Sequence, residues 1–227
     1  KLAPVGEALR LTKSNLPTET ALIGFAGAPW TVMTYMVEGG STRDFAITRK
    51  WAWKYPKQVD ALLGSLIEST ISFLSLQASA GADVLMLFDS WASAVPAAQR
   101  DWLVTRPAQL IIDGLRKNGH QQPVIGFPKG IGEGLIAYVD QSGVDAVGLD
   151  HGVDPVWVDR NLPQNFPVQG NLDPLSLLQA GPEMCRDIDH ILDAFANRPH
   201  IFNLGHGITP PTPTENVQLM LDHVRRH

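Results

Sequence analysis

The sequence has few of the features that mark secreted, membrane-spanning or nucleic-acid-binding proteins. Cys185 is the one cysteine in 227 residues, so an internal disulfide and a cysteine-rich zinc site are excluded. The formal net charge is −5, without the basic excess of a nucleic-acid-binding protein. Continuous apolar runs such as 84–88 are too short to span a bilayer, and the N-terminus lacks an apolar signal core. We therefore expect a cytoplasmic protein that binds neither nucleic acid nor a membrane.

Short apolar runs recur along the chain, and 44% of the residues are hydrophobic, enough for one sizeable core. Six runs read as strands: Ala21–Phe25, Val84–Phe88, Val124–Phe127, Asp145–Leu149, Phe166–Gln169 and His200–Leu204. They are continuous rather than alternating, which is typical of parallel strands buried on both faces.

Amphipathic stretches lie between these runs. Apolar residues three and four apart predict helices at Asp60–Ala80, Met184–Phe195 and Val217–Val224. Asp154-Pro155 and Asp173-Pro174 read as N-caps followed by proline, and Thr212–Glu215 fits a capping box. Alternating strands and capped helices predict an α/β fold with a parallel sheet.

The pattern alone allows either a doubly wound sheet or a (β/α)8 barrel. No Gly-x-Gly-x-x-Gly follows an early strand, which weakens the dinucleotide-binding version of the sheet. In a barrel, chemistry lies on the loops after the strands. The polar candidates in such loops are Asp89-Ser90, Pro128-Lys129, Asp150-His151, Asn171–Asp173 and His206.

Several segments resemble the uroporphyrinogen decarboxylase family in the family's own order. The stretches that carry the resemblance are Gly24–Thr31 with Thr34–Gly40, Phe88–Ala92, Gly126–Gly130, Gln169–Pro174 and Phe202–Ile208. The first and the last are long and specific. The resemblance covers nearly the whole chain.

The resemblance implies a single (β/α)8 TIM barrel over residues 1–227, here without about the first two strand–helix units. It implies a carboxy-lyase of haem and porphyrin biosynthesis that converts uroporphyrinogen III to coproporphyrinogen III by removing carbon dioxide from four acetate side chains. It also implies a homodimer that needs neither a metal nor an organic cofactor.

The resemblance further implies that Tyr35, Ser90 and His206 contact the tetrapyrrole substrate, with Phe25 and Phe88 as weaker candidates for apolar walls. The family's arginine-rich segment and its catalytic aspartate have no match here, so no residue is assigned a catalytic role. If both precede Lys1, the 227 residues alone are expected to be inactive.

Each assignment has a plainer alternative. Tyr35 could be half-buried packing, Ser90 a helix N-cap, and His206 a loop residue with a local hydrogen bond. A corrinoid methyltransferase would share the barrel but needs a zinc site of His, Cys and Glu, and Cys185 lies in no His-x-Cys pattern. A non-catalytic piece of a longer enzyme is the other alternative.

Overall fold

The computed structural model describes residues 2–40 and 42–227, so Lys1, at which the printed sequence begins, lies outside the described residues. The chain divides into two compact units, Lys1–Asp145 and Ala146–His227, and each is described by itself. The prediction of a single domain over residues 1–227 stays a prediction.

Helices and strands alternate through both units. The first unit contains α1 (Ala3–Asn15), β1 (Ile23–Gly27), α2 (Pro29–Glu38), α3 (Ala46–Lys54), α4 (Pro56–Ser79), β2 (Val84–Asp89), α5 (Arg106–Lys117), β3 (Val124–Pro128) and α6 (Gly134–Gln141). Between β2 and α5 run two short 3-10 turns, Ala92–Ala94 and Ala97–Gln99, and a π-helical turn, Asp101–Thr105. The second unit contains β4 (Ala146–Gly148), α7 (Pro155–Asn161), β5 (Val168–Gln169), α8 (Pro174–Gln179), α9 (Pro182–Ala194), β6 (His200–Ile201) and α10 (Thr214–Val224).

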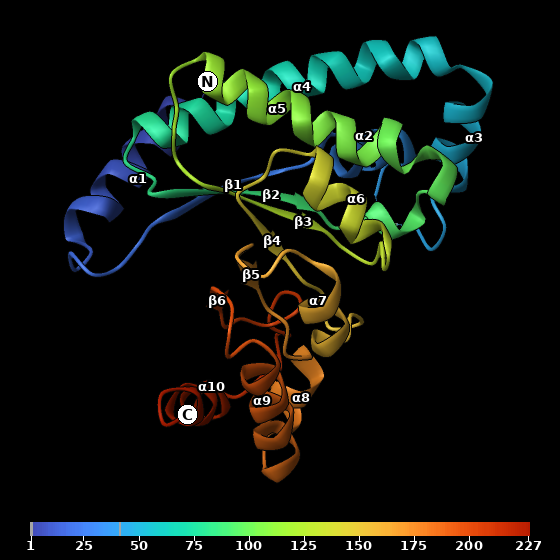
Figure 1. The fold of residues 1–227 in the computed structure, drawn as a ribbon. Coiled ribbons are helices and arrows are strands. Elements are labelled where there is room, and N and C mark those ends of the chain that lie inside the picture. Colours follow the sequence, from blue (N-terminus) through green and yellow to red (C-terminus); the bar gives the residue numbers. More distant parts are fainter. Residues whose placement is uncertain (1, 41) are drawn as a thin grey trace. The chain divides into compact units, whose positions relative to one another are not determined.

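The first unit is built on three parallel strands in the order β1-β2-β3. Every residue of β3 is buried, as expected for a strand covered on both faces. Helices α4 and α5 run side by side along one face of the sheet (Figure 1). Their apolar sides supply much of the core, with Leu74 and Ile111 fully buried.

Helix α4 bears on the expectation that the apolar runs are too short to span a bilayer. Its 24 residues are long and apolar enough to cross a membrane by length and composition, although serines and Glu68 interrupt every run. One side of the helix is buried, at spacings of three and four through Leu63, Ile67 and Leu74, and the helix packs on β1, β2 and α5. Such a stripe is typical of a core helix in an α/β layer.

The second unit repeats the same arrangement on shorter strands. Strands β4, β5 and β6 pair in parallel, with Val147 opposite Val168 and Val168 opposite His200. Helices α7, α8 and α10 all pack on α9 (Figure 1). The carboxylates of Asp154 and Asp173 accept hydrogen bonds from the backbone N–H groups two residues later, both at 2.9 Å. Both predicted N-caps are therefore confirmed.

The predicted α/β class with parallel strand–helix repeats is confirmed, and each expected strand lies within its predicted run or within two residues of it. The predicted capping box at Thr212–Glu215 is wrong. Helix α10 takes Pro213 as its N-cap and has no side-chain cap. The Thr212 hydroxyl lies 2.8 Å from that of Thr209 instead, so it closes the preceding turn.

Candidate active site

Three phenylalanines form a row across the sheet of the first unit. The rings of Phe25 and Phe88 lie 5.8 Å apart, and those of Phe88 and Phe127 lie 5.7 Å apart, both edge to face. Phe88 stands opposite Phe127 in the strand register, so both side chains leave the same face. Phe25 is 61% exposed. The two predicted wall residues thus lie in one apolar strip, and Phe127 extends it.

Tyr35 lies near the C-terminal end of α2, the helix that follows β1. Proline at the first position starts this helix, and Gly39, with φ of +76°, caps its end by donating to the Tyr35 carbonyl. The Tyr35 hydroxyl accepts a hydrogen bond of 2.8 Å from Nε1 of Trp91. The tyrosine is 43% exposed. Because its oxygen is the acceptor in this contact, its own O–H remains available to donate to a ligand.

Asp89 ends β2 and orders the loop that follows. Its carboxylate is 3% exposed and accepts a 2.6 Å hydrogen bond from the Thr31 hydroxyl, which in turn accepts the N–H of Trp91 at 3.2 Å. Burial raises the pKa of the Asp89 carboxyl to about 7, although the Thr31 hydrogen bond opposes the shift. Asp89 thus ties the loop after β2 to the start of α2.

Ser90 follows Asp89 and is only half-buried. Its hydroxyl forms no hydrogen bond within residues 2–40 and 42–227, so it caps no helix there and stays available for a ligand. Trp91 comes next and reaches Tyr35. The first unit therefore brings Tyr35 and Ser90 to the same end of its sheet, with Trp91 as the link between them.

His206 lies in the second unit, past β6, in an exposed loop. Leu204 forms a parallel bridge with Leu172, and the Gly205 N–H donates to the Leu172 carbonyl at 2.7 Å. A side chain at Gly205 would collide with the backbone of His151, so glycine allows the loop to lie directly on the end of β4. His206 is thereby held beside the strand ends of its own unit. Its meeting with Tyr35 and Ser90 remains a prediction.

Asn171 organises the same strand ends. It is 3% exposed, and its Nδ2 donates to the carbonyls of Asp150 and Val153 at 3.0 and 2.8 Å. These bonds fix the loop after β4. Asp150-His151 and Asn171 are thus brought together, as their place after neighbouring strands predicted.

Sequence reasoning did not identify Thr31 and Trp91 as parts of the site. The one sequence signal for Trp91 was its position directly after Ser90. No spacing rule predicts that an indole in the loop after β2 contacts a tyrosine on α2. Among the described residues, no group of three His, Cys, Asp or Glu side chains is placed to hold a metal ion.

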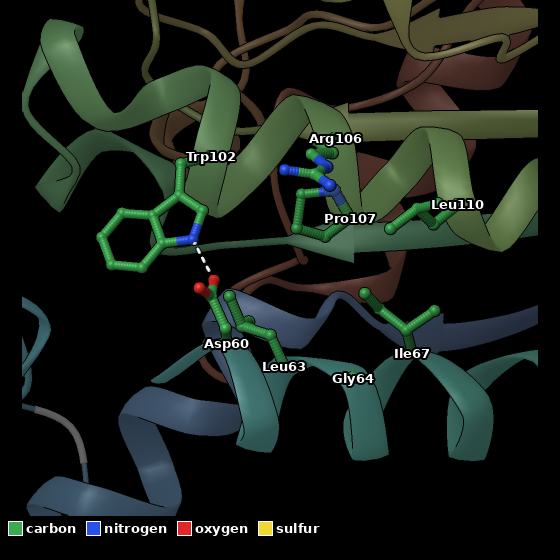
Figure 2. Close-up of a pocket in the computed structure, with 8 residues that line it drawn as sticks. All are labelled: Asp60, Leu63, Gly64, Ile67, Trp102, Arg106, Pro107 and Leu110. Carbon is green, nitrogen blue, oxygen red and sulfur yellow. Dashed lines mark hydrogen bonds between the residues drawn. The ribbon is translucent and has the colours of Figure 1, made fainter. Parts of the chain in front are cut away.

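A hollow lies between α4 and the α5 region of the first unit (Figure 2). Its volume is about 290 Å³. Nε1 of Trp102 donates to Asp60 at its mouth at 2.5 Å, while Leu63, Ile67 and Leu110 form an apolar side. All its lining residues come from helical segments, so we do not place the chemistry there.

The sequence matches known proteins over its whole length. The model of the family described as "Uroporphyrinogen decarboxylase (URO-D)" matches residues 1–227. The chain is 49% identical over 225 residues to the uroporphyrinogen decarboxylase of Novosphingobium aromaticivorans, and 46% identical over 224 residues to that of Maricaulis maris. Each alignment covers 99% of this chain and 66% or 65% of the relative. The chain therefore spans just under two thirds of the length of these curated relatives.

Solved structures agree on the fold. A methyltransferase from Methanosarcina mazei superposes with a TM-score of 0.84 over 99% of this chain and 64% of its own, at 18% identity. A B12-independent methionine synthase from Shewanella sp. W3-18-1 gives 0.64 over 97% of this chain and 64% of its own, at 14% identity. At such identities the likeness shows the fold alone. The strand–helix repeats are those of a (β/α)8 barrel, of which this chain holds a part, and the sequence matches place it in the uroporphyrinogen decarboxylase family.

Proposed function

We propose that the protein containing this chain removes the carboxyl groups of the four acetate arms of uroporphyrinogen III to give coproporphyrinogen III. The family match over residues 1–227 carries this proposal. The local geometry supports it, because a tyrosine hydroxyl oriented by an indole lies at the end of β1–β3, where barrel enzymes carry their sites.

The reaction needs an electron sink. When the bond to the carboxyl carbon breaks, carbon dioxide leaves and its electron pair stays on a methylene carbon. A protonated pyrrole of the substrate can take up that pair, and a proton then replaces the lost carboxyl group. The tetrapyrrole therefore acts as its own cofactor, and we propose that no metal or organic cofactor is used. The protein must bind, orient and stabilise charge.

We assign binding roles to three polar side chains. Tyr35 donates its O–H to a substrate carboxylate, since its oxygen already accepts from Trp91. Ser90 offers a second hydroxyl at shorter reach. His206 binds a carboxylate as imidazolium or passes a proton near neutral pH. None of these groups replaces the electron sink, so their loss should weaken binding more than it changes the chemistry.

The phenylalanine row gives the substrate an apolar surface. Phe25 and Phe88 present ring edges and faces on one side of the sheet, and Phe25 is largely exposed. We propose that the macrocycle lies against them while its carboxylates reach the polar groups.

Turnover of uroporphyrinogen III by the intact protein, followed without oxygen and by chromatography of the oxidised products, tests the proposal. Activity that survives dialysis against a chelator is expected. Tyr35→Phe, Ser90→Ala and His206→Asn should each raise KM. Tyr55→Phe is the matched control, because Tyr55 is 42% exposed and lies between α3 and α4. No coproporphyrinogen from the wild type would reject the proposal.

We also propose that the protein is a cytoplasmic homodimer that binds neither nucleic acid nor a membrane. The bacterial relatives support the cytoplasmic part of this proposal, and the homodimer rests on the resemblance to the family. Light scattering of the intact protein after size exclusion measures the assembly, and a monomeric mass would contradict it.

A further inference from the structure

A second cavity in the first unit is lined by three arginines. It has a volume of about 510 Å³, and Arg43, Arg49 and Arg100 all contribute to its wall. They come from three segments: the loop before α3, α3 itself, and the residue before the π-helical turn. The sequence as a whole carries a net charge of −5, so a gathering of three cations on one cavity needs an explanation.

Acidic residues neutralise this cavity only in part. Among the described residues, Arg100 alone of the three has a carboxylate within ion-pair distance, Glu133 at 3.3 Å, and that glutamate is 79% exposed. Asp44 also lines the cavity, and its carboxylate, which accepts the N–H of Ala46, offsets one of the three positive charges. The lining therefore keeps an excess positive charge, which favours an anionic ligand.

Two of the arginines leave a buried donor unused. The Nε atoms of Arg49 and Arg100 are buried and have no hydrogen-bond partner within the described residues. A buried N–H without an acceptor costs free energy. In each guanidinium the Nη1 atom is already engaged, by the Asp44 carbonyl in Arg49 and by Glu133 in Arg100. The opposite edge, formed by Nε and Nη2, is the one that binds a carboxylate through two parallel hydrogen bonds.

The cavity shares a wall with the candidate active site. Trp91 lines it, and the same indole donates to the Tyr35 hydroxyl. The rings of Trp91 and Phe45, another lining residue, lie 5.0 Å apart. A molecule with several carboxylates could therefore contact Tyr35 with one arm and the arginines with another.

We propose that Arg49 and Arg100, assisted by Arg43, form an anion-binding pocket that holds a carboxylate arm of the substrate while a neighbouring arm contacts Tyr35. The inference rests on the proposed function, because the tetrapyrrole supplies the carboxylates. The pocket assigns a role in substrate binding to arginines within this chain.

Binding of uroporphyrin, the stable oxidised form with eight carboxylates, to the intact protein tests the pocket through quenching of tryptophan fluorescence. Arg49→Gln and Arg100→Gln should each raise the Kd about tenfold, because a hydrogen-bonded charge is lost. Arg49→Lys should recover only part of the affinity, since lysine keeps the charge but not the fork. Arg10→Gln is the matched control. Arg10 is an exposed arginine paired with Glu7, and its loss should leave the Kd within twofold.

Inorganic phosphate distinguishes the source of the anion. If phosphate binds the wild type but not the glutamine variants, while uroporphyrin binds all of them equally, the pocket serves a free anion and the substrate-arm proposal is overturned. Equal binding of both ligands by all variants overturns the pocket altogether. Circular dichroism of each variant must match the wild type. Failure of the proposed function looks different, because the wild type itself would then neither turn over uroporphyrinogen nor bind uroporphyrin.

Discussion

The hydroxyl of Tyr35 accepts a hydrogen bond from the indole nitrogen of Trp91, 56 positions later in the sequence, at 2.8 Å. This contact fixes both the position of the phenol and the direction in which its own proton can point. Trp91 is held in turn, because its carbonyl accepts from Nε1 of Trp30 and its N–H donates to Thr31. Tyr35 is thus oriented by a network that reaches the fully buried Trp30.

Trp91→Phe removes the donor and keeps an aromatic ring. We expect KM for uroporphyrinogen to rise about fivefold with little change in kcat, since one hydrogen bond of about 1 kcal/mol no longer orients the phenol. In a Tyr35→Phe background the same change should add little, because the partner is already gone. Trp102→Phe is the control, since it removes an indole donor to Asp60 at the hollow. Additive effects of the two substitutions would show that Trp91 does not act through Tyr35.

Asp89 makes stability depend on pH. Its pKa in the folded protein is about 7, raised by burial, so the folded state binds a proton more tightly than the unfolded state does. This tighter proton binding contributes about 4 kcal/mol to the free energy of unfolding below pH 4. The contribution is lost as pH rises to 7. Asp89→Asn cannot ionise. The free energy of unfolding of Asp89→Asn, compared with that of the wild type, should therefore be about 2–3 kcal/mol more favourable at pH 8 than at pH 5.

Urea unfolding at the two pH values measures this difference. Asp113→Asn, at an exposed position on α5, is the matched control and should not reproduce the change. A difference between Asp89→Asn and wild type that is equal at pH 5 and pH 8 would mean that Asp89 is ionised throughout.

The strands could be predicted from the sequence because each is a continuous apolar run closed by polar or turn residues. Val84–Asp89 and Val124–Pro128 were placed to within one residue. The aspartate N-caps were equally predictable, because the Asp-Pro pair combines a side-chain acceptor with a residue that lacks an N–H. The Thr212–Glu215 box satisfied the same local rule, yet the Thr212 hydroxyl pairs with that of Thr209 and α10 has no side-chain cap.

The sequence located the loops that carry the candidate residues, because each loop follows an apolar run. Ser90 comes directly after β2, and His206 lies in the loop past β6, while their role as one substrate site stays a prediction. The network of Thr31, Trp91 and Tyr35 joins residues on α2 to a loop about 60 positions away. Such contacts arise from packing between elements, which no periodicity records. The orphaned donors of Arg49 and Arg100 are likewise a property of three-dimensional burial.

Gln77 on α4 binds the backbone of β1 at Phe25. Its side chain accepts the N–H of Phe25 and donates to the carbonyl of the same residue, both at 2.8 Å. The glutamine is 3% exposed. Gln77→Leu should lower the free energy of unfolding by about 2–3 kcal/mol, because two backbone groups lose their partner. It should also loosen the Phe25 end of the aromatic row.

Gln58→Leu serves as the control for this substitution. Gln58 lies on the same helix but at an exposed position, where its side chain accepts a hydrogen bond from Nε1 of Trp51 and none from the backbone of the described residues. Equal losses of stability in the two variants, measured by urea unfolding, would contradict the role given to Gln77.

Gly205 determines where His206 can lie. A Cβ at this position would collide with the backbone nitrogen and Cα of His151, whereas one at Gly207 meets nothing within 4 Å. Gly205→Ala should therefore cost about 2 kcal/mol or more, because a backbone clash cannot be relieved by a rotamer change. It should also raise KM for uroporphyrinogen, since the loop that carries His206 must move away from the strand ends. Gly207→Ala, on the other side of the histidine, should do neither. Urea unfolding and steady-state kinetics of the two variants measure both effects, and equal behaviour of the two alanine variants would show that close packing of this loop on β4 does not position His206.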